Sequence, residues 1–167
     1  MKKIFIFAFL VIVMGCGGNA KVEFGMDDEA TMRGQLGDLA IWVSKIELTE
    51  DETYVTVWEG SKQVSVEIEE ALFASITDAE VEVSPGSYNS ARLTVDSIYY
   101  IEGTVNKMLV DTAYQFIATA LTAIVIEEND QLSLVVNIAS TNWFDTGTQE
   151  IMSGHSPFEG ARLRIHY

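Results

Sequence analysis

The fold of this chain is decided by the stretch Pro85-Gly-Ser-Tyr-Asn-Ser-Ala-Arg-Leu-Thr-Val95, which carries its longest strand pattern. The Pro-Gly pair is typical of a turn. Beyond it, Ala91, Leu93 and Val95 recur at every second position, so they share one face of an extended chain. The stretch therefore predicts a strand that opens at a turn, buries one face and continues after a bulge into residues 97–101.

The same alternation recurs along most of the chain. Strands are expected at 40–48, 79–83, 132–138 and 161–167, and a hairpin is expected from 53–58 and 63–68 around a turn at 59–62. Segment 114–126 is apolar on both faces, and its β-branched residues favour a strand although its alanines also suit a helix. Residues 71–76 are ambiguous and suit a short helical turn.

This pattern predicts an all-β fold of eight to ten short strands, either a sandwich or a barrel. We favour a Greek-key β-sandwich formed by one domain over residues 38–167. The length of 167 residues suits a single domain with a substantial core.

The N-terminus resembles the leader of a bacterial lipoprotein. Met1-Lys-Lys precedes an apolar run that ends in Val13-Met14-Gly15-Cys16, which is similar to a lipobox. The resemblance implies a signal peptide over residues 1–15 and a diacylglyceryl group, often with further acylation, on Cys16, the only cysteine. Residues 16–37 are then expected to form a flexible acidic tether. Gly17 in place of an aspartate favours the outer membrane if the source is Gram-negative.

A second resemblance rests on Glu82-Val-Ser-Pro-Gly-Ser-Tyr-Asn-Ser-Ala-Arg-Leu-Thr-Val95 and on the segment around Trp58. Its Pro-Gly-x-Tyr turn and Arg-Leu-x-Val strand resemble a domain-of-unknown-function family of prokaryotic envelope lipoproteins. The resemblance implies a sandwich of transthyretin or carboxypeptidase-regulatory type, without catalytic residues. On physical grounds, we expect the Tyr88 hydroxyl to reach the backbone and Arg92 to pair with an acid on a neighbouring strand. Gly86 is expected to permit a turn that a side chain would resist.

Composition argues against several classes of function. A net charge of −15 opposes nucleic-acid binding, because phosphate contacts need clustered Lys and Arg. One cysteine and two distant histidines, His155 and His166, do not make a zinc site. Both histidines are expected on the surface. Neither lies in a motif for nucleophilic catalysis, so we expect no enzyme activity.

Two stretches remain as candidate sites. The turn Glu127-Glu128-Asn129-Asp130 offers oxygen ligands for calcium, although acidic turns are more often simply solvated. Trp143 and Phe144 interrupt the strand pattern and form a candidate recognition patch, but we favour the alternative that they cap an open end of the fold.

The sequence thus predicts a non-catalytic cell-envelope lipoprotein without a cofactor, which binds or positions another envelope component. A lipid anchor attaches it to the membrane, and its candidate partners are an envelope protein or a polysaccharide. The alternative is a calcium- or small-ligand-binding module, and a hydrolase is the remote third.

Overall fold

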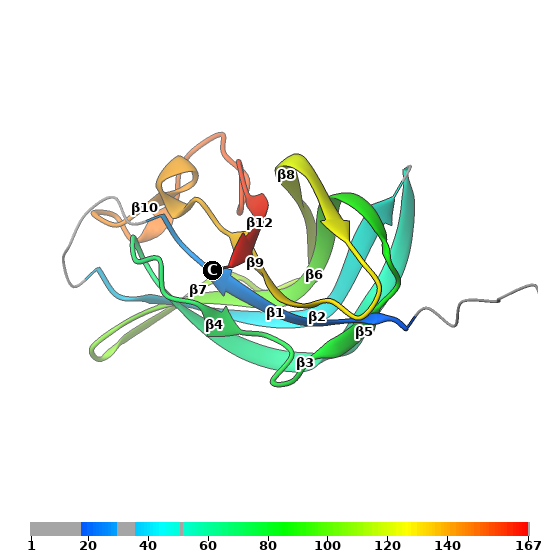
Figure 1. Cartoon of the computed structure of the whole chain (residues 1–167). Coiled ribbons are helices and arrows are strands. Elements are labelled where there is room, and N and C mark those ends of the chain that lie inside the picture. Colours follow the sequence, from blue (N-terminus) through cyan, green and yellow to red (C-terminus); the bar gives the residue numbers. More distant parts are fainter. Residues whose placement is uncertain (1–17, 30–35, 51, 167) are drawn as a thin grey trace, which may run out of the picture.

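The computed structural model describes residues 18–29, 36–50 and 52–166 of the chain, and almost all of its regular structure is strand (Figure 1). The strands are β1 (Ala20–Asp27), β2 (Asp38–Glu50), β3 (Thr53–Glu67), β4 (Ala74–Ser75), β5 (Val81–Val83), β6 (Gly86–Glu102), β7 (Val105–Val110), β8 (Tyr114–Ile126), β9 (Gln131–Asn137), β10 (Phe144–Asp145), β11 (Glu150–Ile151) and β12 (Arg162–His166). One 3-10 turn, η1, covers Ser140–Asn142. The prediction of an all-β fold is confirmed.

Ten of these strands form one mixed sheet. Its path is β3-β2-β6-β8-β12-β9-β1-β4, with β5 added to β1 and β7 added to β6. The pairs β1–β9 and β8–β12 are parallel. The sheet curves until its two ends approach each other, so that Lys62 of β3 reaches Asp78, just after β4 (Figure 1). The expected Greek-key sandwich of two facing sheets is not confirmed, because this single sheet is nearly closed and barrel-like.

The strand that begins at Gly86 is the longest of the described strands, as predicted. β6 spans 17 residues and pairs with both β2 and β8. Its pairing with β2 passes from Val95 to Ser97, so the predicted bulge lies at Asp96. Ala91, Leu93 and Val95 are fully buried. Segment 114–126 is the strand β8, which resolves the open choice between strand and helix.

The predicted hairpin over residues 53–68 is wrong. These residues form β3, a single strand of 15 residues that runs antiparallel to β2 along its whole length. The expected turn at 59–62 does not form. Instead, the pairing of β3 with β2 shifts its register twice in and next to this segment. Gly60 lies close to the Trp58 ring, and a Cβ there would approach this ring to 2.5 Å.

The prediction of a flexible tether over residues 16–37 is wrong for residues 20–27. Ala20–Asp27 form β1, which lies between β9 on one side and β4 and β5 on the other. Val22, Phe24 and Met26 are buried in the core because they occupy alternate positions on its inner face. The domain therefore begins by residue 20, and residues 1–15 and Cys16 lie outside the described residues.

Residues 69–76, which we call the strap, run along the edge of β1 that is opposite β9. The backbone N–H of Ile76 donates to Phe24, and the N–H of Asp28 donates to Glu70. The Phe73 ring covers Gly25, where a Cβ would come within 2.4 Å of it. The strap holds the short strand β4 rather than the helical turn suggested by the sequence. Among the described residues, no helix is long and apolar enough to span a membrane.

Candidate functional site

Trp143 and Phe144 do not form a recognition patch. Both side chains are buried, at 0% and 3% exposed. The Trp143 indole N–H donates to the Ile138 carbonyl at 2.9 Å, and its ring packs against Phe144 and Phe158. These aromatics fill one end of the barrel-like core, which agrees with the alternative that they cap an open end.

The acidic turn at 127–130 connects β8 to β9. The Asp130 carboxylate accepts the Glu127 backbone N–H at 2.8 Å, and Asn129 adopts a left-handed conformation with φ of 64°. The turn is thus held by its own hydrogen bonds. Within the described ranges, no three His, Cys, Asp or Glu side chains cluster as metal ligands do. Calcium binding by Glu127, Glu128, Asn129 and Asp130 stays a prediction.

The two histidines differ in their surroundings. His155 is exposed and its Nδ1 lies 2.9 Å from the Glu159 carboxylate. His166 is half-buried and stacks on Phe73 of the strap, with ring centroids 4.7 Å apart. Each histidine thus contacts a different side chain, and neither of these contacts includes a candidate nucleophile.

A different group of polar residues comes together on the outer face of three neighbouring strands. Register places Asp27 of β1 opposite Asn137 of β9, and Asn137 opposite Arg162 of β12. Paired positions project to the same face of a sheet, so these three side chains form a row. Arg164 follows Arg162 by two positions and shares that face.

Asn137 is the unusual member of this row. It is only 5% exposed, and its Nδ2 donates to Asp27 Oδ1 at 3.0 Å. Its Oδ1 has no hydrogen-bond partner among the described residues. Buried polar atoms are nearly always hydrogen-bonded, so an unpaired amide oxygen is costly unless something else satisfies it.

Asp27 and Arg164 are linked to the same row. The Arg164 guanidinium donates to Asp27 Oδ2 from a half-exposed position. Burial raises the pKa of the Asp27 carboxyl, while the Asn137 hydrogen bond and the Arg164 charge act against that rise. Arg162, in contrast, is exposed and makes no ion pair with any residue that the structure describes.

Asp28 joins the strands around this row. Its carboxylate accepts the backbone N–H of Ser140 at 2.9 Å and of Glu69 at 2.8 Å, and it also accepts the Ser140 hydroxyl. It therefore ties the end of β1 to the strap and to η1. With its oxygens engaged in this way, Asp28 stabilises the local backbone.

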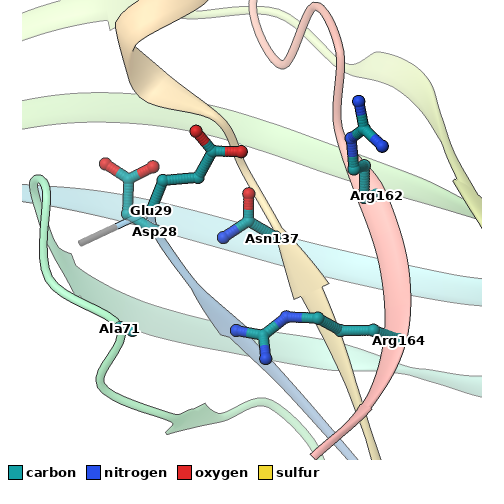
Figure 2. Close-up of a pocket in the computed structure, with 6 residues that line it drawn as sticks. All are labelled: Asp28, Glu29, Ala71, Asn137, Arg162 and Arg164. Carbon is teal, nitrogen blue, oxygen red and sulfur yellow. The ribbon is translucent and has the colours of Figure 1, made fainter. Parts of the chain in front are cut away.

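These residues line a small open pocket, which Figure 2 shows with the acidic groups on one side, the two guanidinium groups on the other and Asn137 between them. The pocket measures about 260 Å³. We call it the Arg162 pocket, and its lining residues are Asp28, Glu29, Ala71, Asn137, Arg162 and Arg164. The Asn137 side-chain oxygen points toward Glu29 and away from Arg164.

Such a lining suits binding by charge and hydrogen bonds. Arg162 presents a planar set of N–H donors that suits a carboxylate or phosphate group. Glu29 and Asn137 Oδ1 accept hydrogen bonds and suit an ammonium or hydroxyl group.

Sequence reasoning missed this pocket for identifiable reasons. Asp27 and Asp28 were assigned to the tether, so their contact with the last strand was not expected. One signal was available, because Asn137 interrupts the apolar run of Leu134, Val135, Val136 and Ile138 near its end. An amide placed next to fully buried residues suggests a buried hydrogen-bond network.

Comparison of the chain with protein-family models, with curated proteins and with solved structures finds no match in any of the three. The geometry of the Arg162 pocket therefore carries the functional interpretation.

Proposed function

We propose that this protein is a non-catalytic lipoprotein of the cell envelope, and that its domain binds a small zwitterionic group in the Arg162 pocket. Its attachment would be the lipid on Cys16 that the lipobox Val13-Met14-Gly15-Cys16 implies. In a Gram-negative source, Gly17 favours the outer membrane. This proposal joins the envelope-binding role expected from the sequence with the alternative of a small-ligand module.

The polarity of the pocket supports a ligand with two opposite charges. Glu29 lies on one side of the pocket and the guanidinium of Arg162 on the other, and Asn137 lies between them with its oxygen toward Glu29 (Figure 2). An anion alone would meet the repulsion of Glu29 and of buried Asp28. A cation alone would meet that of Arg162. A zwitterion satisfies both sides at once.

The unpaired oxygen of Asn137 carries this proposal. It is a buried acceptor fixed in place, because the other end of the same amide is bonded to Asp27. A ligand N–H that reaches it would recover the hydrogen bond that folding leaves unmade. An exposed surface amide would offer no such gain, since water already satisfies it.

The experiment is a thermal-shift comparison on the chain carrying Cys16→Ser. O-phosphoethanolamine, which has a phosphate and an ammonium group, is compared with phosphate alone and with ethanolamine alone. At about one hundred times its Kd, the zwitterion should raise Tm by about 5 °C, and each half should raise it much less.

Two substitutions assign the effect to the pocket. Arg162→Gln should abolish the shift, whereas Lys107→Gln, which also removes one positive charge but pairs with Glu150 elsewhere, should leave it intact. A shift that is equal for phosphate and phosphoethanolamine, or that survives Arg162→Gln, would contradict the proposal.

A further inference from the structure

The sheet opens between β8 and β12. These parallel strands pair only at Arg162–Thr119 and Leu163–Ala120, and then run apart (Figure 1). The cause lies in β8, where four residues, 120–123, face the single residue Asn89 of β6. Such a bulge bends its strand and ends the pairing on its other side.

A slot of about 560 Å³ lies where the strands separate. We call it the β8–β12 slot, and its lining residues are Leu121, Thr122, Ala123, Ile124, Val125, Arg162, Leu163, Arg164 and Ile165. Most of these side chains are apolar. Leu121 is 82% exposed and Val125 is 62% exposed, which is unusual for large aliphatic residues.

The arginines beside the slot indicate which kind of ligand it suits. Arg162 and Arg164 line both this slot and the Arg162 pocket, so one strand, β12, separates the two. A ligand that crosses these arginines would place an anionic group against them, a polar end in the pocket and an apolar chain in the slot. This arrangement is that of a phospholipid headgroup followed by an acyl chain.

We propose that the β8–β12 slot holds one acyl chain of a zwitterionic phospholipid whose headgroup occupies the Arg162 pocket. The inference rests on the proposed function, because the headgroup site is the pocket described above. It goes further in naming the ligand as an amphiphile. The phosphate would lie against Arg162, the ammonium group against Glu29 and Asn137, and the chain along Leu121 and Val125.

The direction of the slot agrees with such a ligand. The pairing of β8 with β12 ends at Leu163–Ala120, and β8 continues beyond this pair into the turn at 127–130. The Asn129 N–H of that turn donates to the carbonyl of Gly18. The turn that follows β8 therefore contacts the chain two residues after Cys16, the proposed lipid site. A headgroup could enter from a membrane there, with its chain trailing behind.

The test measures binding of single-chain phosphoethanolamine lipids of increasing acyl length, each below its critical micelle concentration, to the Cys16→Ser chain by calorimetry. Each added methylene should tighten Kd by about two- to fourfold until the slot is filled. Leu121→Gln combined with Val125→Gln should remove this dependence on length while the binding of O-phosphoethanolamine itself persists. Both side chains are exposed, so the substitutions should leave the fold intact.

Ile117→Gln is the matched control, because Ile117 is also an exposed aliphatic residue of β8 and does not line the slot. It should retain the full dependence on chain length. If O-phosphoethanolamine binds but length has no effect, the slot inference fails while the pocket proposal stands. If neither binds, both fail. A concentration-dependent dimer that the slot substitutions abolish would instead assign the slot to a second copy of this chain and overturn the inference.

Discussion

Arg92 and Glu47 meet across the pairing of β6 with β2, with Arg92 Nε 2.7 Å from Glu47 Oε2. The Glu47 carboxylate is almost fully buried, and Lys45 contacts its other oxygen. The Arg92 hydrogen bond lowers the pKa of Glu47 from its ordinary 4.5 to about 2, although burial acts in the opposite direction. The sequence predicted an acidic partner for Arg92, and this pair confirms it.

Glu47→Gln should lower the free energy of unfolding by about 2 kcal/mol at neutral pH, because it leaves the two cations without their shared carboxylate. Since the pKa of Glu47 is depressed in the folded state, its contribution is complete above about 4.5 and is lost as the pH falls toward about 2. Denaturant titrations of both proteins across this range should show the difference shrinking with acid. A difference independent of pH would contradict this role.

The Tyr88 hydroxyl donates to the Ser84 carbonyl at 2.7 Å, as the sequence predicted for a buried tyrosine beside the Pro-Gly turn. Tyr88→Phe should cost about 1 kcal/mol of unfolding free energy, since it removes this part-buried hydrogen bond. Tyr114→Phe is the comparison, because the Tyr114 hydroxyl makes only a 3.4 Å contact with Pro157. Equal costs for the two substitutions would refute the assignment.

Gly86 serves this turn differently from expectation. It does not have a positive φ, in contrast to Gly37, Gly103, Gly154 and Gly160. A Cβ at Gly86 would instead lie 3.1 Å from the Glu50 carboxylate. Glycine is therefore favoured at position 86 because the Glu50 side chain approaches it closely. No local sequence rule predicts this contact.

At the scale of elements, β1 is the largest departure from the sequence analysis. Its alternation of Val22, Phe24 and Met26 is as regular as that of β6, but it lies among glycines and acids close to the leader, and this composition predicts a tether. The strand is central because β9 pairs with it in parallel from a point more than one hundred residues later. Pairing between segments so far apart along the chain cannot be predicted from the local sequence.

Phe24→Ala should therefore destabilise the domain by about 3 to 5 kcal/mol, as the removal of a fully buried aromatic ring does. Lys21→Ala, on the exposed face of the same strand, should have almost no effect. Equilibrium unfolding in guanidinium chloride measures both. A flexible tether would instead make the two substitutions equally harmless.

Among the strands after residue 85, β6, β8, β9 and β12 were predicted from the sequence, whereas β7, β10 and β11 were not. β6, β8 and β9 have alternating or β-branched sequences bounded by turn residues, so local chemistry specifies them. β3 was divided in error because Glu59-Gly60-Ser61-Lys62 resembles a turn, whereas pairing with β2 keeps it extended. Pairing with β2 thus outweighs the preference of these four residues for a turn.

At the scale of the molecule, the sequence supported an all-β fold but not the single curved sheet. The barrel-like form depends on two parallel pairings, β1–β9 and β8–β12, which join distant segments. The Arg162 pocket depends on the parallel pairing of β1 with β9 and on the antiparallel pairing of β9 with β12, since these two bring Asp27, Asn137 and Arg162 into one row. Only Asn137 carried a local hint of it.

The proposed membrane attachment belongs to the scale of the whole molecule. If the lipid proposed for Cys16 anchors the protein, Cys16→Ser should move it from the membrane fraction to the soluble fraction, because one residue would carry all the acyl chains. Fractionation of cells that express either form, followed by immunodetection, measures this. Unchanged partitioning would refute the lipid anchor without bearing on the pocket.

The central claim, a zwitterion bound between Arg162 and Asn137, is tested most directly by NMR of the side chains themselves. O-phosphoethanolamine is titrated into the labelled Cys16→Ser chain while the Arg162 Nε–H and Asn137 Nδ2 signals are followed. Binding in the Arg162 pocket should give saturable shifts of both signals with one Kd, while the Lys107 side chain stays unchanged. If both signals stay fixed at saturating ligand, or if Lys107 responds as they do, the Arg162 pocket is not the binding site.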